Sequence, residues 1–123
     1  MNIIKQFFYL SNLILFIFYL YPGSILGYFL YGNINIQPQL TRDFLVSSNH
    51  VYVFFIISVI GLVAFKHNLK NIIIYLLFIS VVLEICHLFI PERGFEIADL
   101  FGNIIGVLIS ILILQIIDKG RQK

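Results

Sequence analysis

Long stretches without a charged residue constrain this chain more than any other feature. No Asp, Glu, Lys or Arg occurs in residues 6–41, 44–65 or 100–117. A membrane core takes roughly 20 apolar residues per helix, and fewer where flanking Lys or Arg side chains reach outward. The chain has 123 residues, of which 60% are hydrophobic and 11% are charged. A domain of this size cannot bury so much apolar surface from water. We therefore predict an all-α integral membrane protein with one domain, residues 1–123.

The hydropathy pattern predicts four transmembrane helices in a small bundle. We place them at Ile3–Tyr21, His50–Phe65, Leu69–Ile90 and Ile97–Ile117. The first segment also has the features of a cleavable signal peptide, with Lys5 as its charged region and residues 7–20 as its core. Two observations argue against cleavage. No small-residue site follows the core, and Pro22 stands where the cut would fall.

The segment between the first two predicted helices, residues 22–49, is long for so small a protein. Its middle, Ile25–Tyr31, is too apolar to lie free in water, while irregular backbone cannot lie in lipid. We therefore expect a short interfacial or re-entrant segment that lies against the helices. Several tyrosines are expected to form an aromatic belt at the outer interface; they are Tyr19, Tyr21, Tyr28, Tyr31 and Tyr52.

The distribution of basic residues predicts the orientation in the membrane. With a cytoplasmic N-terminus, six of the eight Lys and Arg residues fall inside, at positions 5, 66, 70, 119, 121 and 123. Only Arg42 and Arg93 fall outside. This asymmetry follows the positive-inside rule, so we expect a multi-pass protein of the cytoplasmic membrane with both termini in the cytoplasm. The basic residues form no stripe, so no nucleic-acid partner is expected.

Polar residues interrupt the last two predicted helices. Glu84 precedes Pro91 by seven residues, which places its carboxylate on the order of 10 Å below the helix end. An unpaired carboxylate at such a depth costs about 3 kcal/mol, so a partner is expected. His87 lies on the same helix face, three residues on. In the next helix, Asp99 and Asn103 share one face.

A turn of about six residues joins these two helices, so they are expected to be antiparallel neighbours whose polar side chains converge. We predict one ligand-binding cluster in the outer half of the membrane. Its members are Glu84, His87, Arg93, Asp99 and Asn103, with His50 joining from the second helix. Plainer roles stay open. Asp99 is placed to cap a helix N-terminus, and Glu84 to pair structurally with Arg93 or His87.

The same residues limit the chemistry that can be expected. Glu84 and His87 are candidates for acid–base catalysis. A nucleophile is lacking, because the adjacent helical residues Cys86 and His87 point about 100° apart. Di-iron bundles carry a Glu-x-x-His pair on each of two helices, whereas this chain has one such pair. We therefore predict no metal site, and the sequence contains no cofactor-binding motif.

A row of small residues lies on the last predicted helix. Gly102, Gly106 and Ser110 recur every four residues, a spacing that lets another helix approach closely. We predict a helix-packing face at this row. The approaching helix belongs either to this chain or to a partner, so a homo- or hetero-oligomer through the last helix is one expectation.

The stretch just described resembles the characteristic segment of the VanZ-like family of small membrane proteins. That segment reads Glu-x-x-Gln, Phe-x-Pro-x-Arg, an Asp six residues later, and Asn-x-x-Gly. The matching residues are Glu84, Phe89, Pro91, Arg93, Asp99, Asn103 and Gly106. Two departures occur. His87 stands where the family usually has Gln, and the Asp-Lys pair that often precedes the family's helix 2 histidine is absent before His50.

The resemblance implies a role in the cell envelope, since the family is named for a protein associated with resistance to the glycopeptide teicoplanin. Three hypotheses follow. The first is binding of a membrane lipid or a lipid-linked cell-wall or polysaccharide intermediate, with Arg93 on its phosphate or carboxylate. The second is an enzyme acting on such a lipid, with Glu84 as base and His87 as acid or relay. The third is a structural partner of another membrane protein.

Overall fold

The computed structural model describes residues 2–123, and all regular secondary structure within that range is helical. In chain order the elements are α1 (Ile3–Leu20), α2 (Ile25–Tyr31), α3 (Ser48–Ala64), α4 (Leu69–Cys86), the 3₁₀ turn η1 (His87–Phe89) and α5 (Ile97–Arg121). The all-α prediction is confirmed. Each of the four predicted long helices has a counterpart, and the observed ends differ from the predicted ends by no more than four residues.

Three of these helices are long and apolar enough to cross a membrane: α1, α4 with its continuation η1, and α5. The chain is therefore described as an integral membrane protein. α3 is apolar but has only 17 residues. At a rise of 1.5 Å per residue it is about 25 Å long, which is less than the membrane core of about 30 Å. The predicted fourth span does not follow from the length of α3 alone.

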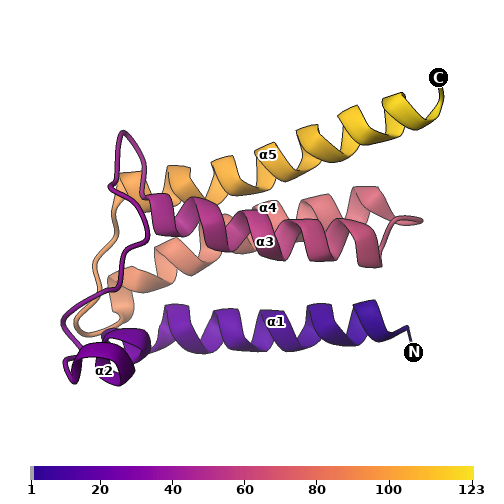
Figure 1. Cartoon of the computed structure of the whole chain (residues 1–123). Coiled ribbons are helices and arrows are strands. Elements are labelled where there is room, and N and C mark those ends of the chain that lie inside the picture. The colour runs from indigo at the N-terminus through magenta and orange to yellow at the C-terminus, as the bar shows by residue number, and fades with distance from the viewer. Residues whose placement is uncertain (1) are drawn as a thin grey trace.

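The long helices run alternately in opposite directions along the bundle (Figure 1). The start of α1, the turn between α3 and α4, and the end of α5 lie at one end, together with both termini. α2, the loop 32–47 and the loop 90–96 lie at the opposite end, which we call the loop end. α4 and α5 are packed antiparallel neighbours, as their short connection predicts.

Charged residues divide unevenly between the two ends of the bundle. The end with the termini holds six basic residues and one acidic residue, Asp118. The loop end holds two basic residues, Arg42 and Arg93, and five acidic ones. The acidic residues of the loop end are Asp43, Glu84, Glu92, Glu96 and Asp99. The loop end therefore carries a net negative formal charge, and the opposite end a net positive one.

Glycines let α5 approach α3 closely. A Cβ atom at Gly106 would lie 2.6 Å from the carbonyl oxygen of Val51, and one at Gly102 would lie 2.8 Å from that of Ser47. Any side chain at these positions would push the two helices apart. Ser110, one turn further on, is also buried. In this structure, the glycines of the predicted row lie against α3 of the same chain.

The apolar core lies between α3 and the helices around it. Its members include Phe8, Leu15, Phe54, Ile57, Leu62, Leu76, Ile79, Leu83 and Val107. Many other apolar side chains of α1, α4 and α5 point outward, among them Leu13, Ile74, Phe78, Leu112 and Ile116. Lipid chains are a suitable solvent for such a surface, because water would leave it unfavourably hydrated.

The segment predicted to be interfacial or re-entrant forms the short helix α2. Ser24 caps it by accepting a hydrogen bond from the Gly27 amide, and the residue that follows its last turn is Gly32, whose φ of 67° suits glycine. Its last four side chains, at positions 28–31, are each more than half exposed although all are apolar or aromatic. α2 thus presents an apolar surface at the loop end.

Candidate functional site

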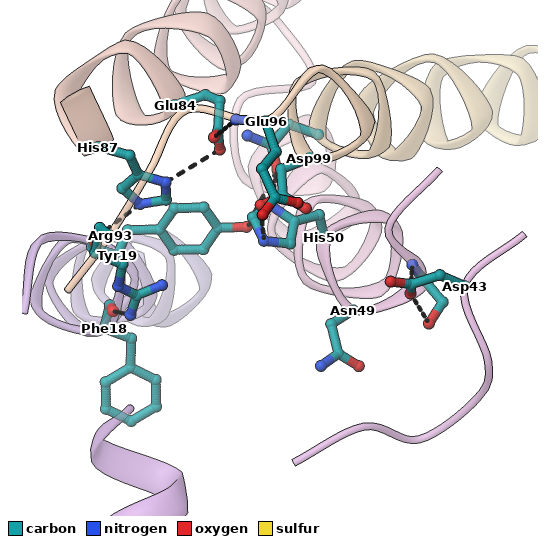
Figure 2. A network of polar contacts seen from close by, with 12 residues as sticks. Phe18, Tyr19, Asp43, Asn49, His50, Glu84, His87, Arg93, Glu96 and Asp99 are labelled. Atoms are coloured by element: carbon teal, nitrogen blue, oxygen red, sulfur yellow. Dashed lines mark hydrogen bonds and ion pairs between the residues drawn. The ribbon is translucent and has the colours of Figure 1, made fainter. Parts of the chain in front are cut away.

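Polar side chains from four helices and η1 meet inside the loop end (Figure 2). We call this group the polar cluster; it consists of Tyr19 from α1, His50 from α3, Glu84 from α4, His87 from η1, and Asp99 and Asn103 from α5. Five of the six are residues that the sequence predicts to converge, and the structure brings them together. The sixth, Tyr19, is not among the predicted residues.

Asn103 determines which nitrogen of His50 carries a proton. Its amide nitrogen donates a hydrogen bond to the Ser80 carbonyl (3.0 Å), so its Oδ1 atom is the acceptor. Oδ1 accepts a hydrogen bond from the Tyr19 hydroxyl at 3.1 Å and lies 2.8 Å from Nδ1 of His50. Nδ1 must therefore be protonated to donate to it. The second ring nitrogen of His50, Nε2, is directed elsewhere.

His50 and Asp99 form the most accessible part of the polar cluster. Nε2 of His50 lies 3.6 Å from Oδ2 of Asp99, and their side chains are 15% and 19% exposed. Because Nδ1 already bears a proton, Nε2 meets Asp99 in one of three ways. Nε2 is protonated and faces the carboxylate, or its lone pair faces a protonated Asp99 carboxyl, or its lone pair and the carboxylate face a shared cation. Asp99 thus faces a side chain of α3 as well as lying in the first turn of α5.

Glu84 and His87 form the buried part of the polar cluster. Nε2 of His87 lies 2.9 Å from the Tyr19 carbonyl oxygen, which can only accept, so Nε2 bears a proton. Nδ1 of His87 lies 3.2 Å from Oε2 of Glu84, and one proton is needed between them. The other oxygen of Glu84 accepts a hydrogen bond from the Glu96 amide at 3.1 Å. Of the two predicted partners of Glu84, His87 is the one found.

Tyr19 is the residue that sequence reasoning misses. The prediction that it belongs to an exposed aromatic belt is wrong, because the residue is only 7% exposed. Its ring stacks on that of His87, with the two ring centroids 5.7 Å apart. A signal was present in the sequence. Tyr19 shares the buried face of α1 with Phe8, Asn12 and Leu15, and the polar Asn12 marks that face as interior.

Arg93 binds the end of α1 rather than a carboxylate. Its Nε donates to the Tyr21 carbonyl (3.2 Å), and its Nη2 donates to the carbonyls of Phe18 and Gly23 (both 2.8 Å). Carbonyls at a helix C-terminus lack donors within the helix, so Arg93 supplies them. Within residues 2–123, no carboxylate oxygen lies within 4.0 Å of its guanidinium, and the alternative pairing with Glu84 is not observed.

The guanidinium of Arg93 is a fixed positive charge at the loop end. Burial lowers its pKa, whereas Tyr19, Glu84 and Asp99 raise it. Since the ordinary pKa of Arg lies far above neutral, the group stays charged. The preceding residue, Glu92, has a φ of 63°, a left-handed conformation that non-glycine residues seldom adopt. The turn that presents Arg93 therefore holds some backbone strain.

A cavity of about 820 Å³ opens beside the polar cluster, between α1, α3 and the loops. The polar groups of the lining, here called the polar wall, include His50, His87, Arg93, Glu96 and Asp99. The apolar side chains that α1 and α3 contribute, here called the apolar wall, are Ile14, Leu15, Phe18, Val53, Ile56 and Ile57. Loop residues between positions 34 and 43 and residues 23–26 also line the cavity. Small-molecule sites typically enclose about 300–1,000 Å³, so the cavity has the size of a ligand site.

Comparison of the chain with models of known protein families, with characterised proteins and with solved structures finds no match. The resemblance to the VanZ-like family therefore rests on the seven matched residues. Their places in the structure differ. Glu84, Asp99 and Asn103 belong to the polar cluster, Arg93 holds the end of α1, and Gly106 packs on α3. Phe89 and Pro91 are exposed in η1 and the loop that follows it.

Proposed function

We propose that this chain is a VanZ-like membrane protein of the cell envelope that binds a membrane lipid, or a lipid-linked cell-wall or polysaccharide intermediate. The observation that carries the proposal is the mixed lining of the cavity. It combines charged and hydrogen-bonding groups with apolar side chains of α1 and α3. A lipid has the same division between head group and chain, whereas a small polar solute would leave the apolar wall without a partner.

We further propose that the loop end faces the outside of the cytoplasmic membrane, with both termini in the cytoplasm. The charge distribution supports this orientation, because six of the eight basic residues lie at the end with the termini. α3 would then be the fourth span. It is short, but Lys66 lies two residues after its end and can extend its side chain to the head groups, while Asn49 and His50 lie at its other end.

The polar wall indicates which head groups would bind. Arg93 offers positive charge for a phosphate, since no hydrogen bond of its Nη1 atom occurs within residues 2–123. Asp99 and Glu96 would accept hydrogen bonds from the hydroxyl or amino groups of a sugar or peptide. A head group that carries both phosphate and hydrogen-bond donors matches this wall better than a phosphate alone. Lipid-linked envelope intermediates have such head groups.

The proposal is tested by native mass spectrometry of the protein taken from membranes in a lipid-preserving scaffold. Val53→Trp would fill the apolar wall of the cavity without altering the polar cluster. Val63→Trp is the matched control, because Val63 is a partly exposed residue of the same helix that does not line this cavity. We expect a retained lipid in the wild type and in Val63→Trp, and its loss in Val53→Trp.

The identity of the retained mass distinguishes the candidates. A mass that matches a lipid-linked precursor supports the envelope intermediate, and a specific phospholipid supports a simpler lipid-binding role. Equal retention by both tryptophan variants would contradict the proposal. If a precursor is found, the susceptibility of cells to teicoplanin, with and without the gene, tests the link to glycopeptide resistance that the family resemblance suggests.

A second candidate function is an enzyme acting on such a lipid, which the proton shared by Glu84 and His87 supports. The argument against an enzyme is that a substrate has little access to these two residues. Both ring nitrogens of His87 face protein groups, and Glu84 is fully buried. A contact would have to open before either residue reached a substrate, so the geometry favours binding. A Glu84→Gln variant that keeps the lipid yet loses turnover would reverse this preference.

A further inference from the structure

We infer that His50, Glu84 and Asp99 form a binding site for one divalent transition-metal ion of the Zn²⁺ type. The three residues come from α3, α4 and α5, and each offers one ligand atom within 4.8 Å of the other two. Two ligands of a Zn²⁺ ion, each about 2.1 Å from it, lie at most about 4.2 Å apart. A small rotation of the side chains therefore brings the three atoms to coordinating distance. The metal site stands whether or not the cavity takes a lipid.

The hydrogen bonds of His50 prepare it as a ligand. Its Nδ1–H group is directed at Oδ1 of Asn103, whose orientation is set by Ser80. Nε2 then carries the lone pair of the neutral ring and points toward Asp99 (Figure 2). Metal-binding histidines commonly use one nitrogen for the ion and the other as a donor to a fixed acceptor. Asn103 provides that acceptor, and Tyr19 adds a hydrogen bond to it.

Glu84 supplies an independent observation. Its side chain is fully buried, and within residues 2–123 Oε2 has the ion-pair contact with Nδ1 of His87 but no contact that meets hydrogen-bond geometry. Buried carboxylate oxygens are rarely left in this state, because burial without a partner is costly. Oε2 lies 3.2 Å from Nδ1 of His87, which orients the carboxylate, while the Glu96 amide holds the other oxygen. A cation shared with His50 and Asp99 would give Oε2 a second, stronger partner.

The charges around the site also call for a cation. Glu84, Glu96 and Asp99 lie close together, and within residues 2–123 their ion-pair partners are two histidines, His87 for Glu84 and His50 for Asp99, with no Lys or Arg. Arg93 binds backbone carbonyls instead. A divalent ion would offset the electrostatic repulsion between the carboxylates of Glu84 and Asp99, both of which lie near His50.

The donor set indicates the class of ion. One imidazole nitrogen and two carboxylate oxygens suit Zn²⁺ and similar first-row ions, whereas Mg²⁺ and Ca²⁺ prefer oxygen ligands throughout. Three protein ligands leave a fourth position open. His50 and Asp99 line the cavity, so that position would face it. The open position is the place where water or an anionic group of a cavity ligand would bind the metal.

The test uses the full chain in detergent, stripped with a chelator and depleted of lipid. Zn²⁺ is added, excess is removed by gel filtration, and bound metal is measured by elemental analysis. His50→Gln and Asp99→Asn remove one ligand each, and His67→Gln is the matched control because His67 lies at the opposite end of the bundle. We expect about one Zn²⁺ per chain in the wild type and in His67→Gln. In His50→Gln and Asp99→Asn, the affinity for Zn²⁺ should fall at least roughly tenfold.

Co²⁺ provides a second measurement on the wild-type chain. Visible absorption typical of a low-symmetry site with nitrogen and oxygen ligands supports the assignment, and it does so even if a variant fails to fold. No retained Zn²⁺ in the wild type, unchanged retention in folded His50→Gln and Asp99→Asn, or equal competition by Mg²⁺ would each overturn the metal site. Because no lipid is present, these outcomes are independent of lipid retention in the mass-spectrometry experiment.

Discussion

The hydroxyl of Tyr19 and the amide oxygen of Asn103 are 3.1 Å apart, although 84 positions separate them in the sequence. Through its amide nitrogen, Asn103 also binds the backbone of α4 at Ser80, and through Oδ1 it binds His50 of α3. One buried side chain of α5 therefore contacts three other helices. This arrangement fixes the positions of the ionisable groups beside it, which is what a binding site in a small bundle requires.

Replacing Tyr19 with Phe should destabilise the bundle. The ring would keep its stacking on His87, but Asn103 and His50 would lose a buried hydrogen-bonding partner. We expect a loss of about 1–2 kcal/mol in the free energy of unfolding. Thermal unfolding followed by circular dichroism in detergent measures it. Tyr28→Phe is the control, because the Tyr28 side chain is 58% exposed on α2. An equal effect of both substitutions would count against the role of the Tyr19 hydroxyl.

Replacing Gly106 with Leu should separate α3 from α5. The first side-chain atom alone would lie 2.6 Å from the Val51 carbonyl oxygen, so the backbone must move. We expect a loss of at least about 2 kcal/mol, seen as a lower midpoint of thermal unfolding. Gly120→Leu is the matched control on the same helix, because nothing lies near a Cβ atom at Gly120. A stable Gly106→Leu protein would show that this α3–α5 contact is not tight.

Replacing Arg93 with Lys should loosen the end of α1 even though the charge is kept. A guanidinium can reach the carbonyls of Phe18, Tyr21 and Gly23 together, whereas one ammonium group cannot hold all three. We expect hydrogen exchange to rise in peptides that cover residues 18–24. The protection of α5 should not change. Arg42→Lys, in the loop before α3, serves as the control, and unchanged exchange in the Arg93 variant would contradict the anchoring role.

The orientation of the chain can be measured by cysteine labelling. Cys86 is the only cysteine, so Cys86→Ser gives a background without thiols. We expect a membrane-impermeant maleimide to label Asn35→Cys in intact cells and to label Gln122→Cys only after lysis. The first position lies in the loop end, and the second lies beside the C-terminus. Labelling of Gln122→Cys in intact cells would place the termini outside and reverse the proposed orientation.

Much of the fold could be predicted from the sequence because the signal is local. The apolar stretches require helices, and the charges between them mark the ends of those helices to within four residues. The pairing of α4 with α5 follows from their short connection. Gly102 and Gly106 predict close helix packing, but the sequence does not say that α3 is the helix that approaches. Whether α3 spans a membrane is also not decided by its length.

For the site, the sequence by itself indicated five of the six residues of the polar cluster; it missed Tyr19, and it included Arg93, which binds the end of α1 instead. Polar residues in an apolar helix are costly unless they are paired, so Glu84, His87 and Asn103 are identifiable one by one. Only the tertiary structure decided which groups form hydrogen bonds or ion pairs with one another. It joins Arg93 to the end of α1, Glu84 to His87, and His50 to Asn103. These contacts connect residues on different elements, or depend on how a helix end turns, and no local pattern encodes the rotation of one helix against another.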